Sequence, residues 1–281
     1  MVSPPRRPLP AGDFLGLTLV LPSSRARSRR PTDGWRRSCL RPVGMASAPP
    51  SRAPGTNLRI VSLPVEVRAR LNSVFERVEL VAGELLAPAG AVSKYAYFPL
   101  RGVIALVAST AEGQTAQVAL VTAAGPVGVA GLSDGELPFA LIAPVPGNAY
   151  RVRATKLHEV LAGSSARDAW LREVAHGQTM QTVQAALCHR FHAVPARLAT
   201  WLLTVSAAVE SSSLHVTQDV LEQLLGSPRS VVSGAASRFQ ELDLLRVRHG
   251  RVRIVHRAGL AAHACACYAQ TRDMAISRDA R

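Results

Sequence analysis

Between residues 78 and 152, hydrophobic side chains come in short groups separated by gaps that contain Gly or Pro. Groups of this length at near-regular spacing are typical of an antiparallel sandwich or barrel, and we expect a β jelly roll. Ahead of them, Pro64 followed by Val67 and Leu71 predicts a short amphipathic helix. The expected strands are Val78 to Val81, Gly83 to Leu86, Tyr95 to Phe98, Val103 to Val107, Gln117 to Val121 and Ala149 to Val152.

Beyond residue 165 the hydrophobic pattern takes the period of a helix. Residues 165–191 contain no Pro, and their apolar positions suit one long helix, although Gln178 and Gln181 interrupt the stripe. Such a connector can pair with its copy in a homodimer, or it can be an ordinary helix packed on the β module. A second helix begins at Pro195, and we assign its stripe to the core. The apolar positions of the two helices are Leu171, Val174, Met180, Val183 and Leu187, then Leu198, Trp201, Leu202 and Val205.

The segment from Leu214 to His256 predicts a helix-turn-helix. Thr217 can cap a first helix with Asp219 in its first turn, and Gly226 can end that helix. Ser227 then offers an N-cap and Pro228 a first helical residue. The expected buried faces are Val220, Leu221, Leu224 and Leu225 on the first helix, and Val232, Ala235, Phe239 and Leu242 on the second.

A hairpin with one basic face follows the second helix. Leu245 and Val247 alternate with Arg246 and Arg248, the turn is His249-Gly250, and Val252 and Ile254 alternate with Arg251 and Arg253. Alternation of this kind places the apolar side chains on one face of the hairpin and the four arginines on the other. From Arg246 to Arg257 there are five Arg and no acidic residue.

This combination predicts a winged helix-turn-helix that binds double-stranded DNA. A helix in the major groove reads base edges with the exposed residues of its first turns. We therefore expect base contacts from Arg229, Ser230 and Ser233, with Arg229 bidentate to guanine. The phosphate backbone is expected to contact Thr217 and the hairpin arginines Arg246, Arg248, Arg251 and Arg253.

Charge and composition add a basic leader to this picture. The chain has 281 residues and a net charge of +14, of which residues 1–57 contribute +8 through 10 Arg against Asp13 and Asp33. We expect residues 1–57 to be a disordered basic tail, or the product of a start codon assigned too early, with Met45 as the true start. A secretory signal and an organelle transit peptide are the alternatives.

Other classes of protein are disfavoured. No apolar run approaches the roughly 18 residues that a membrane span needs, and four cysteines do not make a disulfide framework, so we expect a cytoplasmic protein without a membrane partner. The chain has no GxSxG, Walker, Rossmann or HExxH motif, and we expect no enzymatic activity.

Two groups of potential metal ligands are each incomplete. Cys188, His189 and His192 lie within two helical turns, but no carboxylate follows to complete a set. A surface histidine pair beside a packed cysteine is the simpler interpretation, so we expect neither metal nor cofactor. His263 precedes Cys265 and Cys267 in what we take to be an exposed tail, where the two thiols could sense redox state or bind a metal.

Residues 58–268 resemble the Crp/Fnr family of bacterial transcription regulators. The resemblance implies a cyclic-nucleotide-binding-like jelly roll, a dimerisation helix, a winged helix and RNA polymerase as a partner. By match to the family's recognition helix, Arg229, Ser230 and Ser233 face bases, whereas Gly234 stands where some members carry a further basic contact residue. The stretches that carry the resemblance are LPVEVRARL, GELLAPAGAVSKYAYFPLRGVIALV, GPVGVAGL, the run from Val216 to Leu260 and the closing ACACY.

The departures from the family concern the effector. Members that bind cyclic AMP carry a Gly-Glu pair and, several residues on, an Arg that holds the cyclic phosphate. Here Gly128 and Gly131 are retained, but Val129 stands in the place of Glu and the next Arg is Arg151. A buried phosphate without a cationic partner is unfavourable, so we expect an unknown effector near Gly128, Val129 and Gly131 rather than cyclic AMP.

The sequence thus predicts an α+β regulator that binds an inverted repeat as a homodimer. The alternative is a ligand-sensing or interaction module whose winged helix contacts protein, with a redox or metal-sensing role for the cysteines. The expected divisions are the tail (1–57), the jelly roll (58–164), the connector helices (165–209), the winged helix-turn-helix (210–268) and a C-terminal tail (269–281).

Overall fold

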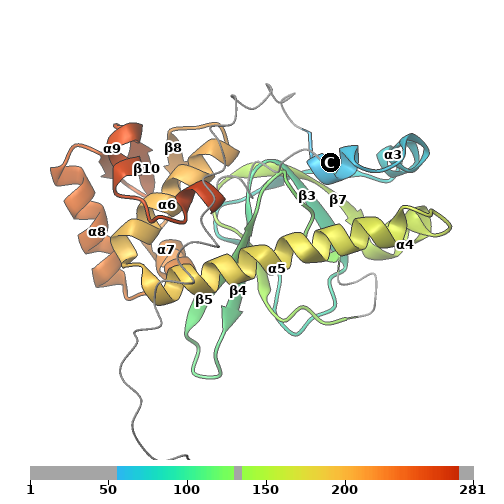
Figure 1. Ribbon diagram of the computed structural model, residues 1–281, viewed down its shortest axis with the longest axis horizontal. Helices are drawn as coiled ribbons and strands as arrows, with labels where there is room; N and C mark the ends of the chain where they lie inside the picture. The colour runs from blue at the N-terminus through green and yellow to red at the C-terminus, as the bar shows by residue number, and fades with distance from the viewer. Residues whose placement is uncertain (1–55, 130–134, 272–281) are drawn as a thin grey trace, which may run out of the picture. The chain divides into compact units, whose positions relative to one another are not determined.

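The computed structural model describes residues 56–129 and 135–271 (Figure 1). The predicted basic tail therefore lies almost wholly outside the described residues, as do Gly131 and most of the C-terminal tail. Among the described residues, no helix is both long enough and apolar enough to cross a membrane.

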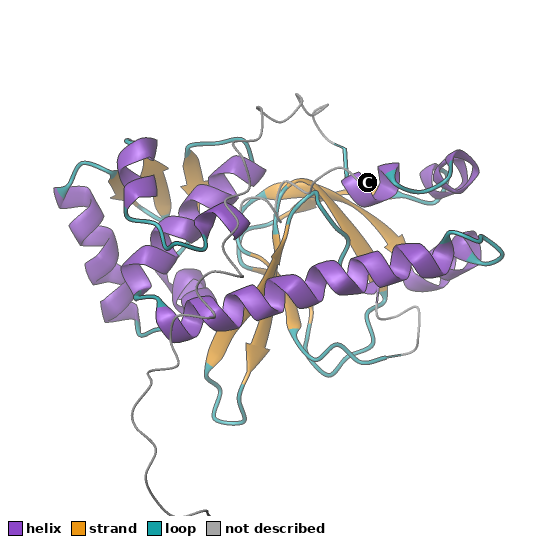
Figure 2. Ribbon diagram, in the orientation of Figure 1, coloured by secondary structure: helices purple, strands orange, loops and turns teal. Residues whose placement is uncertain are grey.

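The first half of the described chain forms two antiparallel sheets, which confirms the predicted sandwich (Figure 2). One sheet has the order β1-β7-β3 and the other the order β2-β6-β4-β5. The six predicted strands are present, and β6 is an additional strand that alternation did not indicate because its sequence, ALIA, is apolar throughout. The bounds are β1 (Glu76–Leu80), β2 (Glu84–Ala87), β3 (Tyr95–Arg101), β4 (Ile104–Ser109), β5 (Thr115–Val121), β6 (Ala140–Ala143) and β7 (Gly147–Arg153).

Three short helices, α2 (Leu58–Val61), α3 (Val65–Asn72) and α4 (Ala154–Leu161), flank the sandwich. The predicted helix is α3, which begins directly after Pro64 and buries Val67 and Leu71. These side chains share a hydrophobic cluster with Phe98 and with Trp170 of the following long helix.

The long helix α5 (Arg167–Phe191) confirms the predicted connector and lies along strand β5 (Figure 1). The glutamines that interrupt its stripe contact the sandwich: Gln181 accepts a hydrogen bond from the Leu120 amide (3.1 Å), and Gln178 donates to the Pro126 carbonyl (3.4 Å). Polar positions on this helix therefore face the β module, while Met180, Val183 and Leu187 remain exposed.

The C-terminal part packs three helices around α6 (Val194–Ala208), whose predicted stripe is buried. The predicted hairpin, β9 (Leu245–Arg248) and β10 (Arg251–Ile254), gains a third strand, β8 (Ser213–His215), in the order β8-β10-β9. Strand β8 has three residues, which is too short for alternation to reveal. The remaining elements are α7 (Gln218–Leu225), α8 (Arg229–Glu241) and α9 (Arg257–Ala262).

Candidate nucleic-acid interface

Helix α7 begins and ends at the residues that the sequence indicated. The Thr217 hydroxyl oxygen accepts a hydrogen bond from the Val220 amide (3.2 Å), and Gly226 adopts the left-handed conformation with φ of 55°. A Cβ at Gly226 would lie 3.0 Å from the Thr115 carbonyl oxygen on β5, so glycine also permits a close approach to the sandwich.

The start of helix α8 differs by one residue from the prediction. Pro228 is the N-cap, and the helix begins at Arg229. Ser227 does not cap it, because its hydroxyl donates to the Leu225 carbonyl (3.3 Å) and accepts from Arg197 (3.1 Å). Val232, Ala235 and Phe239 are buried as predicted, whereas Leu242 is the C-cap and is 40% exposed, because the helix ends before this side chain can turn toward the core.

The predicted base-reading residues lie on the exposed side of the first turns of α8, where Arg229 and Ser230 are exposed and Ser233 is half-buried. The Gln218 side chain joins two of them: its Oε1 accepts from Arg229 Nε (3.2 Å) and from Ser233 Oγ (3.1 Å). Arg229 also pairs with Asp219 at 3.0 Å. The first turn of α7 therefore orients the Arg229 side chain. The sequence did not predict this contact, because nothing in the local pattern distinguishes Gln218 from other polar residues of a helix.

The wing presents its arginines as predicted, with Arg246, Arg248, Arg251 and Arg253 exposed and Leu245, Val252 and Ile254 buried. In the strand register, Arg248 lies opposite Arg251 and Arg246 lies opposite Arg253. Like charges directly opposite each other on a sheet destabilise it, and an anionic partner removes that cost.

Two wing arginines also interact with neighbouring side chains within the chain. Arg246 pairs with Asp243 at 2.7 Å, and Arg251 Nε donates to the ring of His215 on β8. Arg257, the fifth arginine of the run, is an exposed residue that donates to Ser206 Oγ (3.2 Å) and to the Leu203 carbonyl (3.4 Å). Arg257 therefore joins α9 to α6 and is not part of the wing surface.

The residues predicted near the effector are tightly packed. Gly128 has φ of 77°, and a Cβ there would lie 2.3 Å from the Tyr95 carbonyl oxygen. Val129 packs against the hydrophobic cluster of Phe98 and Trp170. Gly131, the third residue of the set, lies outside the described residues.

A cavity of about 90 Å³ lies elsewhere, among β5, α5, α6 and α7, with Gln117, Gln184 and Trp201 in its lining. At its edge, His189 Nε2 donates to the Gln117 carbonyl (3.2 Å), so Nδ1 accepts from Arg197. Burial, reinforced by the Arg197 charge, lowers the pKa of His189 below its usual value. His189 thus links the sandwich to α6 and does not share a site with His192.

Comparison with known proteins agrees with this geometry. Residues 196–263 match the model of the Crp-like helix-turn-helix domain. No curated protein matches the chain.

Several solved structures share the fold, with sequence identities of 20% or less. A transcriptional regulator of the Crp/Fnr family from Eubacterium rectale aligns with 13% identity and a TM-score of 0.56 over 72% of this chain and 95% of its own. FixK2 from Bradyrhizobium japonicum aligns with 17% identity and a TM-score of 0.56 over 69% and 98%. A Crp/Fnr regulator from Thermus thermophilus aligns with 20% identity and a TM-score of 0.53 over 67% and 98%.

Residues 196–263 therefore carry a Crp-like helix-turn-helix domain, and the chain shares its fold with solved regulators of the Crp/Fnr family.

Proposed function

We propose that the protein binds an inverted-repeat operator as a homodimer and reads it with Arg229, Ser230 and Ser233. The observation that carries the proposal is the pair of basic features on the winged helix: an arginine held at the start of α8 and a wing whose arginines lie opposite one another. The wing arginines and Thr217 would contact phosphates. Two-fold symmetry then requires half-sites about 10 bp apart, centre to centre.

Pairing through α5 is supported by its exposed apolar side chains. Met180 is 42% exposed, Val183 50%, Leu187 46% and Phe191 68%. Residues three and four apart share one face of a helix, so these four form a stripe. Exposed apolar stripes of this kind mark interfaces, and the stripe fits a second copy of α5.

The expected effector is not cyclic AMP bound in the family's usual manner. Val129 packs against apolar side chains where that mode needs a carboxylate, and Arg151, the nearest following arginine, pairs with Glu76 at 2.9 Å. Titration calorimetry of the full chain with cyclic AMP should show no saturable binding, and tight binding would contradict the proposal.

We propose that an effector of another class acts near Gly128 and Val129. We also propose that the protein acts in the cytoplasm and that the DNA-bound dimer has RNA polymerase as its partner.

The decisive experiment is selection of duplexes from a random pool by the full chain, followed by sequencing and by anisotropy titrations at several salt concentrations. Enrichment of a palindrome with half-sites one helical turn apart would support the proposal. Binding without enrichment and without a salt dependence would instead favour a winged helix that contacts protein, because displaced counterions make DNA affinity fall steeply with salt.

A further inference from the structure

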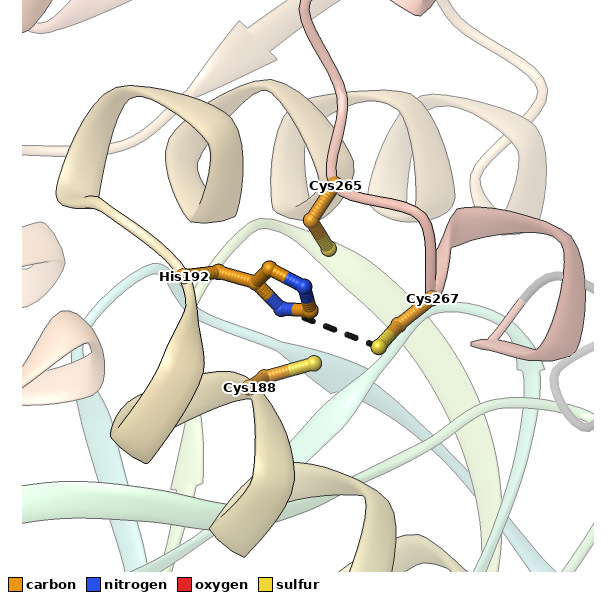
Figure 3. A group of neighbouring side chains, drawn as sticks. All are labelled: Cys188, His192, Cys265 and Cys267. Carbon is orange, nitrogen blue, oxygen red and sulfur yellow. Dashed lines mark hydrogen bonds between the residues drawn. The ribbon is translucent and has the colours of Figure 1, made fainter. Parts of the chain in front are cut away.

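Four potential metal ligands from two distant parts of the chain meet beside the winged helix (Figure 3). Cys188 lies in the last turn of α5 and His192 directly follows that helix, while Cys265 and Cys267 follow α9. Their donor atoms all lie within 4.8 Å of one another. We propose that Cys188, His192, Cys265 and Cys267 form a tetrahedral Zn²⁺ site that fastens the winged helix to the end of α5.

The donor set and its spacing fit a single zinc ion. Three cysteines and one histidine are a ligand set of structural zinc sites, with Zn–S near 2.3 Å and Zn–N near 2.0–2.1 Å, which places neighbouring donors about 3.5–3.8 Å apart. Cys267 Sγ is already 3.7 Å from His192 Nδ1. Donors this close to one another leave room for one ion but not for the several iron and sulfide atoms of an iron–sulfur cluster.

The backbone holds the two ligand pairs in position. Cys188 and His192 are four residues apart at the end of a helix, so they share a face, and the His192 amide still donates to the Cys188 carbonyl (3.1 Å). On the other side, the Cys265 amide donates to Thr200 Oγ1 (3.1 Å) on α6. The Tyr268 and Thr271 amides donate to the carbonyls of Cys265 and Cys267, each at 2.9 Å.

The three cysteines are partly or fully buried, and two of them have polar neighbours. Cys265 is 6% and Cys267 8% exposed, so these thiols are not in an exposed tail as the sequence suggested. Thr200 Oγ1 lies 3.1 Å from Cys265 Sγ, and Gln184 Nε2 donates to Cys188 Sγ (3.6 Å).

Charge also balances at this position. Three thiolates and Zn²⁺ leave one negative charge, and the half-buried Arg197 is close enough to Cys188 and Cys265 to interact with them electrostatically. Supporting groups of this kind orient ligands and tune a metal site. His263, the histidine of the HxCxC sequence, is not a member, because its Nδ1 bonds to the Gly259 carbonyl (2.9 Å).

The proposed role follows from where the ligands lie. Cys188 lies at the end of α5 and His192 in the junction between α5 and α6, whereas Cys265 and Cys267 come after the winged helix. A zinc ion bound by all four residues would link the end of α5 to the segment that follows α9. It would thereby fix the winged helix against α5, the helix that we propose as the dimer interface. Because structural zinc contributes directly to folding free energy, removing it should lower the thermal midpoint.

The test measures metal in the full chain, independently of DNA binding. The purified protein should contain one zinc per chain, and Co²⁺ added to the metal-free protein should give the thiolate charge-transfer and tetrahedral d–d absorption of a three-thiolate site. Cys267→Ser and His192→Ala should each weaken zinc in chelator competition by more than about 100-fold, whereas His263→Ala should retain wild-type affinity.

Several outcomes would overturn the proposal. They are a metal-free folded protein that gives no Co²⁺ charge-transfer band, a disulfide between two of the three cysteines, and iron with acid-labile sulfide in place of zinc. The Co²⁺ titration uses the unsubstituted chain, so it decides the question even if a ligand variant fails to fold. Zinc binding with no selected operator would leave this proposal standing while contradicting the proposed function.

Discussion

At the scale of single residues, the recognition surface depends on how a side chain is held as much as on which side chain is present. Arg229 is tied to both Gln218 and Asp219 on α7, and Ser233 shares the same Gln218 oxygen. A guanidinium that is already oriented loses less conformational freedom when it meets a base. The acidic partner lies beside the proposed DNA surface, so Asp219 also limits nonspecific attraction to phosphates.

Replacing Arg229 by Ala should therefore reduce specificity more than general affinity. We expect Arg229→Ala to cost roughly 1–3 kcal/mol on the selected operator and to relax the preference at one base pair. Competition between the operator and single-base variants in anisotropy titrations measures both effects. Arg238→Ala is the matched control, because Arg238 is also exposed on α8 but pairs with Glu241 near the other end of the helix. Equal losses for the two variants would contradict the assignment.

At the scale of elements, two surfaces are incompletely satisfied within a single chain. The wing sets arginine against arginine across its strands, and α5 exposes an apolar stripe. Both arrangements destabilise an isolated chain, because like charges repel each other and the burial of exposed apolar side chains is favourable. We propose a partner for each surface, DNA for the wing and a second copy of the chain for α5.

The wing is expected to contribute affinity without sequence preference. Arg251→Ala should weaken binding to all duplexes alike and reduce the slope of log affinity against log salt by about 1, because one phosphate contact is lost. Titrations of operator and scrambled duplexes at several salt concentrations measure the slope. Arg77→Ala, which changes an exposed arginine on β1, should leave both slopes unchanged. A loss on the operator alone would assign Arg251 to base reading.

The stripe on α5 is expected to hold the homodimer. Leu187→Asp introduces a charge into both copies of a symmetric interface, so we expect the dimer dissociation constant to rise by at least about 10-fold, or about 1.4 kcal/mol. Sedimentation velocity over a concentration series measures the shift. Val61→Asp is the control, because Val61 is 45% exposed but lies on α2. Dimers of unchanged stability would exclude this face of α5 as the interface.

At the scale of the whole molecule, the sequence predicted elements whose pattern lies within one segment. It did not predict sites that are assembled from distant segments. Periodicity located α5, α6 and the wing, because each pattern is contained within one element. The cysteine cluster escaped prediction because half of its ligands lie at the end of α5 and half after α9, and each half taken alone is incomplete. Gln218 and Arg197 were missed for the same reason, since their roles depend on partners from other helices.

Arg197 gives the clearest test of how the parts are joined. Its guanidinium donates to the Leu225 carbonyl (2.8 Å) at the end of α7 and to Ser227 Oγ (3.1 Å), and it also meets His189, which bonds to β5. One side chain thus links the connector, the helix-turn-helix and, through His189, the sandwich. Removing it leaves a carbonyl and an imidazole nitrogen in a partly buried site without their donor.

We therefore expect Arg197→Ala to lower the free energy of unfolding by about 1.5–3 kcal/mol, the range for hydrogen bonds that involve charged groups. Urea unfolding followed by circular dichroism measures the change, with Arg238→Ala as the control, since exposed ion pairs contribute about 0–1 kcal/mol. If the link also aligns the winged helix, Arg197→Ala should weaken operator binding although Arg197 is not among the residues that we propose to contact DNA. Wild-type stability in this variant would show that the packing of α6 and α7 alone joins the two parts.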